Sequence, residues 1–166
     1  MTTDTDVDTT DTHEVVTPGA TAAEYTALVE RSLRFLRDLN GKDPEQIATW
    51  FCDESTLWIP PAAARVGARR IARLLRVIFA QYAELHWRAR RLYPVNATTM
   101  ITEVDTWGRF ADGRDYRNSI LTVQRFNAAG KLLVLSDYFK STEVFASAPV
   151  PEPAARPEVS PVRTTS

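Results

Sequence analysis

Four segments that alternate between apolar and polar residues follow one another in the second half of the chain, at about 86–93, 98–109, 115–126 and 131–144. Alternation with a period of two is typical of strands that bury one face. Asp112-Gly113 and Ala129-Gly130 separate the last three segments, and these residue pairs suit the tight turns of hairpins. The pattern therefore predicts a run of antiparallel strands that pair with their neighbours along the chain.

Helical patterns come before this run. Thr21 and Glu24 form a capping box at the start of the first helix, because each side chain can bond a backbone N–H that lacks a helical partner. Three helices are expected: from Thr21 to Gly41, from Asp43 onward, and from Gly67 to Ala83. The second helix would have Ile47, Trp50 and Phe51 on its apolar face. A short strand is expected at Ser55–Pro60. Helices first and strands later indicate the α+β class. We expect a cone-shaped, curved, mostly antiparallel sheet over three N-terminal helices, enclosing a conical cavity.

Composition divides the chain into one domain with two tails. Residues 1–20 are rich in Thr and Asp and contain five acids and no Lys or Arg, so they lack the apolar surface that would offset the entropy of ordering. Residues 147–166 hold five of the ten prolines. Both segments are predicted to be disordered, and residues 21–146 are predicted to form the folded α+β domain.

Charge and cysteine content narrow the class of protein. Residues 21–166 carry 20 basic and 16 acidic groups, which is far from the charge of a nucleic-acid-binding protein. Cys52 is the single cysteine, and no apolar run approaches the length of a membrane span. We expect a soluble, cytoplasmic protein with no nucleic-acid or membrane partner. Metal-ligand spacing is absent, so neither a metal nor a cofactor is expected.

Two aspartates, Asp105 and Asp137, lie in the middle of predicted strands. An ionised carboxylate inside a core is costly unless it is paired, hydrogen-bonded or protonated, so such groups point to a site of proton transfer. Side chains two apart share a face, which groups Glu103 with Asp105 and Trp107, and Leu133 with Leu135, Asp137 and Phe139. Asn118 shares a face with Ile120 on the strand between them.

If the middle strand pairs with both neighbours, one concave surface carries Glu103, Asp105, Asn118 and Asp137. Carboxylates so close together cannot all stay ionised, and one could serve as a general acid while another serves as a base. The alternative is that Glu103 and Asp105 face solvent and that Asp137 is a hydrogen-bonded strand residue. Trp58, Trp87 and Trp107 are interpreted as cavity or core aromatics.

A second cluster is basic. The segment 65–76 carries five arginines, namely Arg65, Arg69, Arg70, Arg73 and Arg76. They could bind a phosphate-rich partner, but a solvated helix face explains a charge run of this kind more simply.

Several short motifs resemble limonene epoxide hydrolase, within the SnoaL-like group that shares the nuclear transport factor (cystatin-like) fold. They are Thr102-Glu103-Val104-Asp105, Gly113-Arg114-Asp115-Tyr116, Ser119-Ile120-Leu121, Gly130-Lys131 and Asp137-Tyr138-Phe139. Weaker similarity runs back through Gly67-Ala68-Arg69 and Asp53-Glu54-Ser55-Thr56, so it covers nearly the whole predicted domain. The resemblance implies a sheet over helices with an enclosed site.

The resemblance also implies roles for residues. It places the acid that protonates an epoxide oxygen at Asp105 and the base that deprotonates the attacking water at Asp137. This chain has Glu103 where the family has an arginine, and Trp58 and Pro60 near the positions of the Tyr and Asn that help hold the water. Trp58 and Pro60 offer that water few hydrogen-bond partners. Proton transfer on a bound organic molecule therefore suits the altered set better than hydrolysis by a held water.

Three hypotheses follow. The first is a cofactor-free acid–base enzyme of secondary metabolism that opens an epoxide of an apolar terpenoid or polyketide intermediate, by hydrolysis or intramolecular cyclisation. The second is a polyketide cyclase or ketosteroid-isomerase-like enzyme, and the third is a non-catalytic ligand-binding or assembly protein. The predicted partners are a small-molecule substrate and a second copy of the chain. The expected catalytic residues are Asp105, Asp137 and Glu103, and the expected substrate-binding residues are Asn118, Trp58, Trp107, Ile120, Leu135 and Phe139.

Overall fold

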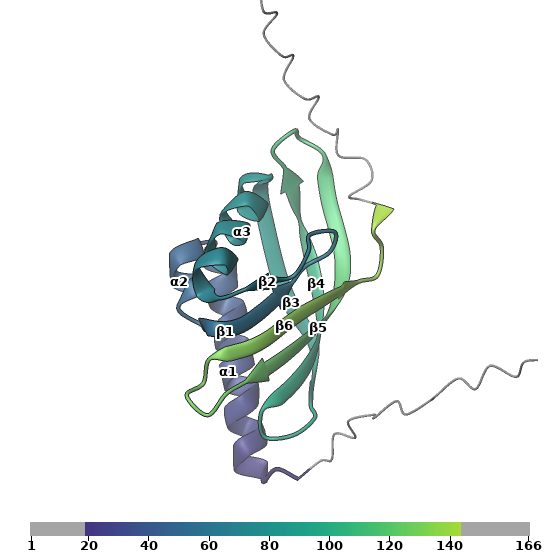
Figure 1. The fold of residues 1–166 in the computed structure, drawn as a ribbon. Helices are drawn as coiled ribbons and strands as arrows, with labels where there is room; N and C mark the ends of the chain where they lie inside the picture. Colours follow the sequence, from purple (N-terminus) through teal and green to yellow (C-terminus); the bar gives the residue numbers. More distant parts are fainter. Residues whose placement is uncertain (1–18, 144–166) are drawn as a thin grey trace, which may run out of the picture.

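The computed structural model describes residues 19–143. Three helices, α1 (Ala22–Gly41), α2 (Pro44–Ala48) and α3 (Ala68–Ala80), lie against one sheet, as Figure 1 shows. The six strands are β1 (Phe51–Trp58), β2 (Arg65–Val66), β3 (Tyr82–Pro94), β4 (Thr99–Phe110), β5 (Asp115–Phe126) and β6 (Leu132–Phe139). The α+β class and the curved sheet over N-terminal helices are therefore confirmed. The predicted tails, 1–20 and 147–166, lie outside the described residues except for Gly19 and Ala20.

The sheet has the strand order β2-β1-β6-β5-β4-β3. The β3–β4, β4–β5 and β5–β6 pairs are antiparallel neighbours, as the run of alternating segments predicted. The β1–β6 pair is parallel, so the sheet is mixed. The C-terminal strand of the described chain thus lies near the middle of the sheet, between the first strand and the fifth.

Capping residues close in sequence determine where α1 and α2 begin. The Thr21 hydroxyl accepts from the Glu24 N–H, and the Glu24 carboxylate accepts from the Thr21 N–H at 2.7 Å, which completes the predicted capping box. The Asp43 carboxylate accepts from the N–H groups of Glu45 and Gln46 at the start of α2.

Two predicted boundaries were wrong. Phe51 begins β1 instead of extending the apolar face of α2, and β1 therefore starts before the predicted Ser55. Helix α3 ends at Ala80, so Tyr82 begins β3 and is not part of the helix. A buried aromatic ring satisfies both a helical and an alternating pattern, and tertiary pairing decides between the two.

The core lies between the helices and the concave face of the sheet. Leu28 and Phe35 of α1, Ile71 of α3, and Met100 and Phe126 of the sheet are each at most 2% exposed. Among the described residues, no helix is long and apolar enough to cross a membrane.

Gly108 of β4 lets two strands approach closely. A Cβ atom added there would lie 2.0 Å from the backbone oxygen of Glu84 and 2.9 Å from Cα of Leu85, both on β3. The register of β3 against β4 shifts between Tyr82 and Glu84, next to this contact. Any side chain at position 108 would therefore push the two strands apart.

We expect Gly108→Ala to lower the free energy of unfolding by about 2–3 kcal/mol, because the backbone must move to admit the methyl group. Gly41→Ala is the matched control, since a Cβ at position 41 meets nothing within 4 Å. Urea denaturation of both variants would measure the difference, and equal stabilities would contradict the close-approach explanation.

Candidate functional site

A cavity of about 510 Å³ lies between the helices and the concave face of the sheet. Most of its wall is aliphatic or aromatic, with Phe35 and Leu39 from α1, Leu75 and Ile78 from α3, and Val104 from β4 among the lining residues. The charged side chains in its lining are Asp137 and Arg65. A cavity of this size and character can hold a small organic molecule.

Asp137 of β6 faces this cavity. The Thr122 hydroxyl donates to Oδ1 of Asp137 at 2.8 Å. Burial raises the pKa of Asp137 from 3.8 to about 6, and the hydrogen bond from Thr122 partly opposes that rise. No salt bridge to Asp137 occurs within the part of the chain that the structure describes. The carboxyl group therefore changes charge close to neutral pH.

A row of hydroxyl groups runs across the sheet beside this carboxyl. Thr102 of β4 is opposite Thr122 of β5, and Thr122 is opposite Asp137 of β6. The Thr102 hydroxyl is buried and has no hydrogen-bond partner among the described residues, whereas the Thr122 hydroxyl donates to Asp137. The adjacent cavity residue Gln124 accepts a buried hydrogen bond from Ser32 of α1.

Tyr116 of β5 also lines the cavity. Burial raises the pKa of Tyr116, and the negative charge of Asp137 raises it further. The Thr106 hydroxyl lies 3.2 Å from the Tyr116 hydroxyl. Tyr116 is thus a neutral phenol at physiological pH, able to donate a hydrogen bond inside the cavity.

The two aspartates lie on opposite faces of the sheet, which contradicts the expected shared surface. Asp105 is opposite Ser119 on β5, whereas Asp137 is opposite Thr122 on β5. Ser119 and Thr122 are three residues apart, and strand side chains alternate faces, so the two point in opposite directions. The expectation that Asp105 and Asp137 act as a coupled pair is therefore wrong.

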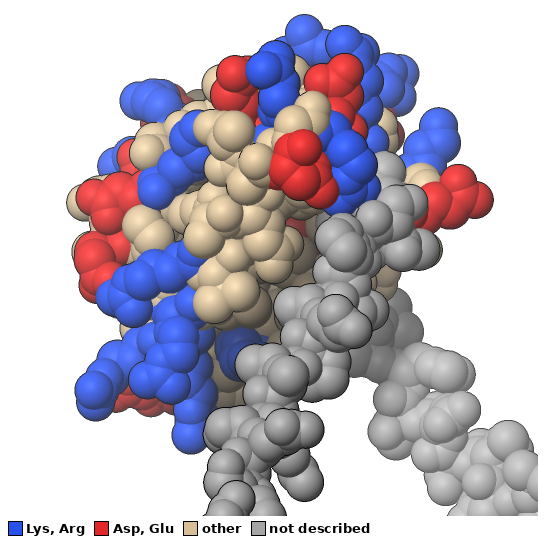
Figure 2. All heavy atoms as spheres, turned by 90° about the horizontal axis from the view of Figure 1, so that it is seen from above, with Lys and Arg blue, Asp and Glu red and all other residues tan. Residues whose placement is uncertain are grey.

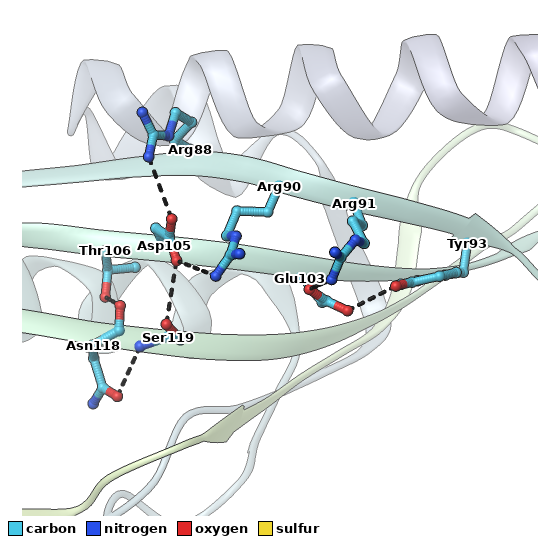
Figure 3. A network of polar contacts seen from close by, with 9 residues as sticks. All are labelled: Arg88, Arg90, Arg91, Tyr93, Glu103, Asp105, Thr106, Asn118 and Ser119. Atoms are coloured by element: carbon cyan, nitrogen blue, oxygen red, sulfur yellow. Dashed lines mark hydrogen bonds and ion pairs between the residues drawn. The ribbon is translucent and has the colours of Figure 1, made fainter.

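Asp105 and Glu103 are on the convex face, in a network of ion pairs and hydrogen bonds (Figure 3). Asp105 contacts Arg88 at 3.4 Å, Arg90 at 3.7 Å and the Ser119 hydroxyl at 3.2 Å. This matches the alternative in which both acids face solvent, and the cavity has no second carboxylate in its lining.

Glu103 has its own partners on that face. The Tyr93 hydroxyl donates to Glu103 at 2.7 Å, and Arg91 lies 3.1 Å away. The hydrogen bond from Tyr93 is the main cause that lowers the pKa of Glu103. Glu103 is thus an ionised surface group, remote from the carboxyl of Asp137.

Of the six predicted substrate-binding residues, three line the cavity and three do not. Ile120, Leu135 and Phe139 line the cavity. Trp58 and Trp107 do not: the Trp58 ring packs on Tyr138 with centroids 5.4 Å apart, and the Trp107 ring stacks on His86 at 5.5 Å.

Asn118 is also absent from the cavity lining. Its amide nitrogen donates to the Ser141 carbonyl at 2.7 Å, so it fixes the chain that follows β6. Trp87, interpreted as a cavity or core aromatic, does line the cavity.

Sequence reasoning missed Thr122 and Tyr116. The signal was available, because both are an even number of residues from Ile120 and so share its face of β5. Counting along that strand from Ile120, which was assigned correctly, identifies both hydroxyl groups.

Within residues 19–143, no group of three or more His, Cys, Asp or Glu side chains is placed to hold a metal ion. The polar groups of the cavity include a carboxyl, hydroxyls, two carboxamides and one guanidinium. What this set can do chemically is accept, donate or orient a proton.

Solved structures with the same fold include several described as enzymes. An LEH-like epoxide hydrolase from M. tuberculosis is 19% identical, with a TM-score of 0.58 over 75% of this chain and 88% of that one. The epoxide hydrolase/cyclase-like enzyme SalBIII, described in pyran ring formation in the polyether salinomycin, is 12% identical with a TM-score of 0.62 over 70% and 93%. A ketosteroid isomerase-like protein from Erwinia carotovora atroseptica is 17% identical, with a TM-score of 0.58 over 73% and 99%.

Sequence identities this low show only that the folds are similar. No curated protein matches the chain by sequence. The model of the SnoaL-like domain matches residues 33–134, which is more than half of the chain and includes β1 to β5. The chain belongs to the SnoaL-like domain family.

Proposed function

We propose that this protein is a cofactor-free proton-transfer enzyme that acts on an apolar small molecule, with Asp137 as the general base. The observation that carries the proposal is the Asp137 carboxyl group in the wall of an apolar cavity, with its pKa raised to about 6 by burial. A general base works best when its pKa lies near the operating pH, because it is then both ionised and basic enough.

The reaction that this arrangement supports best is removal of a proton from the carbon next to a carbonyl group. The Asp137 carboxylate takes the proton, and the electron pair of the C–H bond moves to the carbonyl oxygen as an enolate. The Tyr116 hydroxyl can donate a hydrogen bond to that oxygen. Protonated Asp137 then returns its proton to another carbon, which completes an isomerisation, or to the alkoxide formed when the enolate attacks a second carbonyl.

Epoxide opening is the second candidate. Asp137 would take the proton of a substrate hydroxyl, whose oxygen attacks an epoxide carbon as the C–O bond of the ring breaks. Tyr116 would donate a hydrogen bond to the departing oxygen, and protonated Asp137 would then return its proton to that oxygen. The observation that favours this candidate is the presence of a carboxyl and a neutral phenol in one cavity. The acid role once expected of Asp105 has no support, because Asp105 is on the other face. Assays with β-keto esters, enones and hydroxy-epoxides discriminate the two reactions from each other and from ligand binding without turnover.

We further propose that the protein forms a homodimer through the convex face of the sheet. Four large apolar side chains on this face are between 37% and 50% exposed, namely Tyr93, Trp107, Leu121 and Tyr138. Charged residues alternate with them, since Glu103 is opposite Leu121 and Arg117 is opposite Trp107, and exposed apolar side chains on one face favour association with another protein surface. The Arg88, Arg90 and Arg91 side chains lie beside it.

Leu121→Asp is expected to shift the protein to monomers, because it places a charge in the middle of this face. Sedimentation equilibrium measures the molecular mass at several concentrations. Leu33→Asp is the matched control, since Leu33 is equally exposed but lies on α1. A dimer that persists in Leu121→Asp would contradict the proposed interface.

Asp137→Asn is expected to lower kcat/KM by at least about 10²-fold, because an amide cannot accept the proton. In the wild type, kcat/KM should rise with pH through about 6 and then level off, since the base must be ionised. Asp105→Asn is the matched control and should change kcat/KM less than about twofold, since a solvent-facing ion pair on the far side of the sheet contributes little. Near-wild-type turnover of Asp137→Asn would end the proposal.

Thr122→Val is expected to raise the pKa of Asp137 further, because it removes the hydrogen bond that stabilises the carboxylate. The pH at which activity reaches half of its plateau should rise with it, and NMR titration of the carboxyl carbon measures the same change directly. Thr102→Val is the control: it removes a neighbouring hydroxyl that has no partner, so the pKa of Asp137 should not move. Equal effects of the two variants would contradict this role of Thr122.

A further inference from the structure

The cavity contains a positive charge that the proton-transfer proposal does not use. Arg65 belongs to the two-residue edge strand β2, where it is opposite Leu57 of β1. Leu57 in turn is opposite Leu135 of β6, and both leucines are buried. Residues directly opposite each other point to the same face, so Arg65 extends into the concave side, where it lines the cavity with Asp137.

Arg65 retains unused hydrogen-bond donors. Its Nη1 atom donates to the carbonyl oxygens of Ala63 at 3.0 Å and Ala64 at 3.4 Å. A guanidinium group has five N–H donors in a planar fork, and the described residues provide partners for Nη1 alone. The side chain is half-buried, which distinguishes it from an arginine on a solvated face.

Arg65 and Asp137 do not neutralise each other. No ion pair joins them. They are separated by two strand spacings and two residues along the strand, which places their Cα atoms on the order of 12 Å apart. The cavity therefore has a cation at one place in its wall and the proposed base at another, with apolar surface between them.

Part of the cavity wall is exposed to solvent. Pro61, Val77 and Gln81 are exposed residues that also line the cavity, and Pro61 is in the loop that leads to Arg65. Helix α3, which follows β2, contains four arginines and no acidic residue. In the view from above, Lys and Arg side chains, drawn in blue, gather on the side of the molecule where Figure 1 places α2 and α3 (Figure 2).

Of the five arginines in this segment, Arg65 is the one that lines the cavity. Arg69, Arg70, Arg73 and Arg76 are exposed, and Arg76 pairs with Glu45 of α2. A solvated helix face accounts for these four, as the sequence suggested. It does not account for Arg65, which is half-buried and lines the cavity.

We propose that the cavity takes a ligand with an apolar body and one anionic end group, such as a carboxylate, with the anion bound by Arg65 and the body directed toward Asp137. This inference rests on the proposed function, because it names the substrate class of the same site. Arg65 would bind the anion with its free donors, and the ionised Asp137 would repel an anion from the other end. The two charges together would fix which end of the ligand meets the base.

The test measures binding without turnover. N-phenyl-1-naphthylamine, a neutral fluorescent probe of apolar cavities, is displaced at pH 8 by decanoate or by decan-1-ol, which differ in the charge of one end. Wild type should bind decanoate at least about tenfold more tightly than decan-1-ol, since a hydrogen bond to a charged group contributes on this scale. Arg65→Gln should bring the two affinities within about twofold of each other while leaving probe affinity unchanged. Arg65→Lys should keep part of the preference.

Arg73→Gln is the matched control, because it removes the same charge from an exposed position of α3 outside the cavity. The Arg73→Gln variant should keep the wild-type preference for decanoate over decan-1-ol. Equal affinities for the two competitors in wild type, equal losses in Arg65→Gln and Arg73→Gln, or no binding of the probe would overturn the inference. Loss of the preference alone leaves the proton-transfer proposal standing, and near-wild-type turnover of Asp137→Asn leaves the anion preference standing.

Discussion

The desolvation of one carboxyl group is the constraint to which the rest of the site is adapted. Burial holds the pKa of Asp137 at about 6 instead of 3.8, which corresponds to roughly 3 kcal/mol of differential stability between its two charge states. Because the folded pKa is the higher one, the contribution of Asp137 to stability is greatest below pH 3.8 and is lost as pH rises through about 6. At neutral pH this loss is the energetic cost of the base that we propose at Asp137.

The same strand contributes the burial that offsets this cost. Leu132 is fully buried and Leu135 is 5% exposed. Burial of each leucine contributes about 1.5–3 kcal/mol, which together matches or exceeds the desolvation of the carboxylate. The hydroxyl of Thr122 limits the rise in pKa, and the apolar wall maintains it. The pKa of Asp137 is thus determined by the balance between the hydrogen bond from Thr122 and the apolar surface around the carboxyl group.

Much of the fold could be predicted because its signals are local. The capping box at Thr21 and the turn glycines act within a few residues, and the family motifs are contiguous. Which side of each strand points to the core is not determined by residues close in sequence. On β4, the inner face has Met100 and Val104 with Thr102 and Thr106, while the outer face has Ile101 and Trp107 with Glu103 and Asp105.

Both faces of β4 therefore carry two large apolar residues, and alternation alone does not say which one is inside. The register of β4 on β5 decides it, and that register depends on packing against the helices. The same limit affects Trp58, whose ring could not be assigned to a face before the parallel pairing of β1 with β6 was known.

Among the described strands, β6, which carries Asp137, is the last along the chain, yet it occupies an interior place in the sheet between β1 and β5. Without β6, β1 and β5 would add two unpaired edges to the outer edges at β2 and β3, each presenting backbone donors and acceptors to any other strand nearby. Pairing of β1 with β6 joins residues about 80 positions apart, a non-local contact of the kind that slows folding. The proposed active site and the protection of the nascent protein from aggregation are thus completed by the same eight residues.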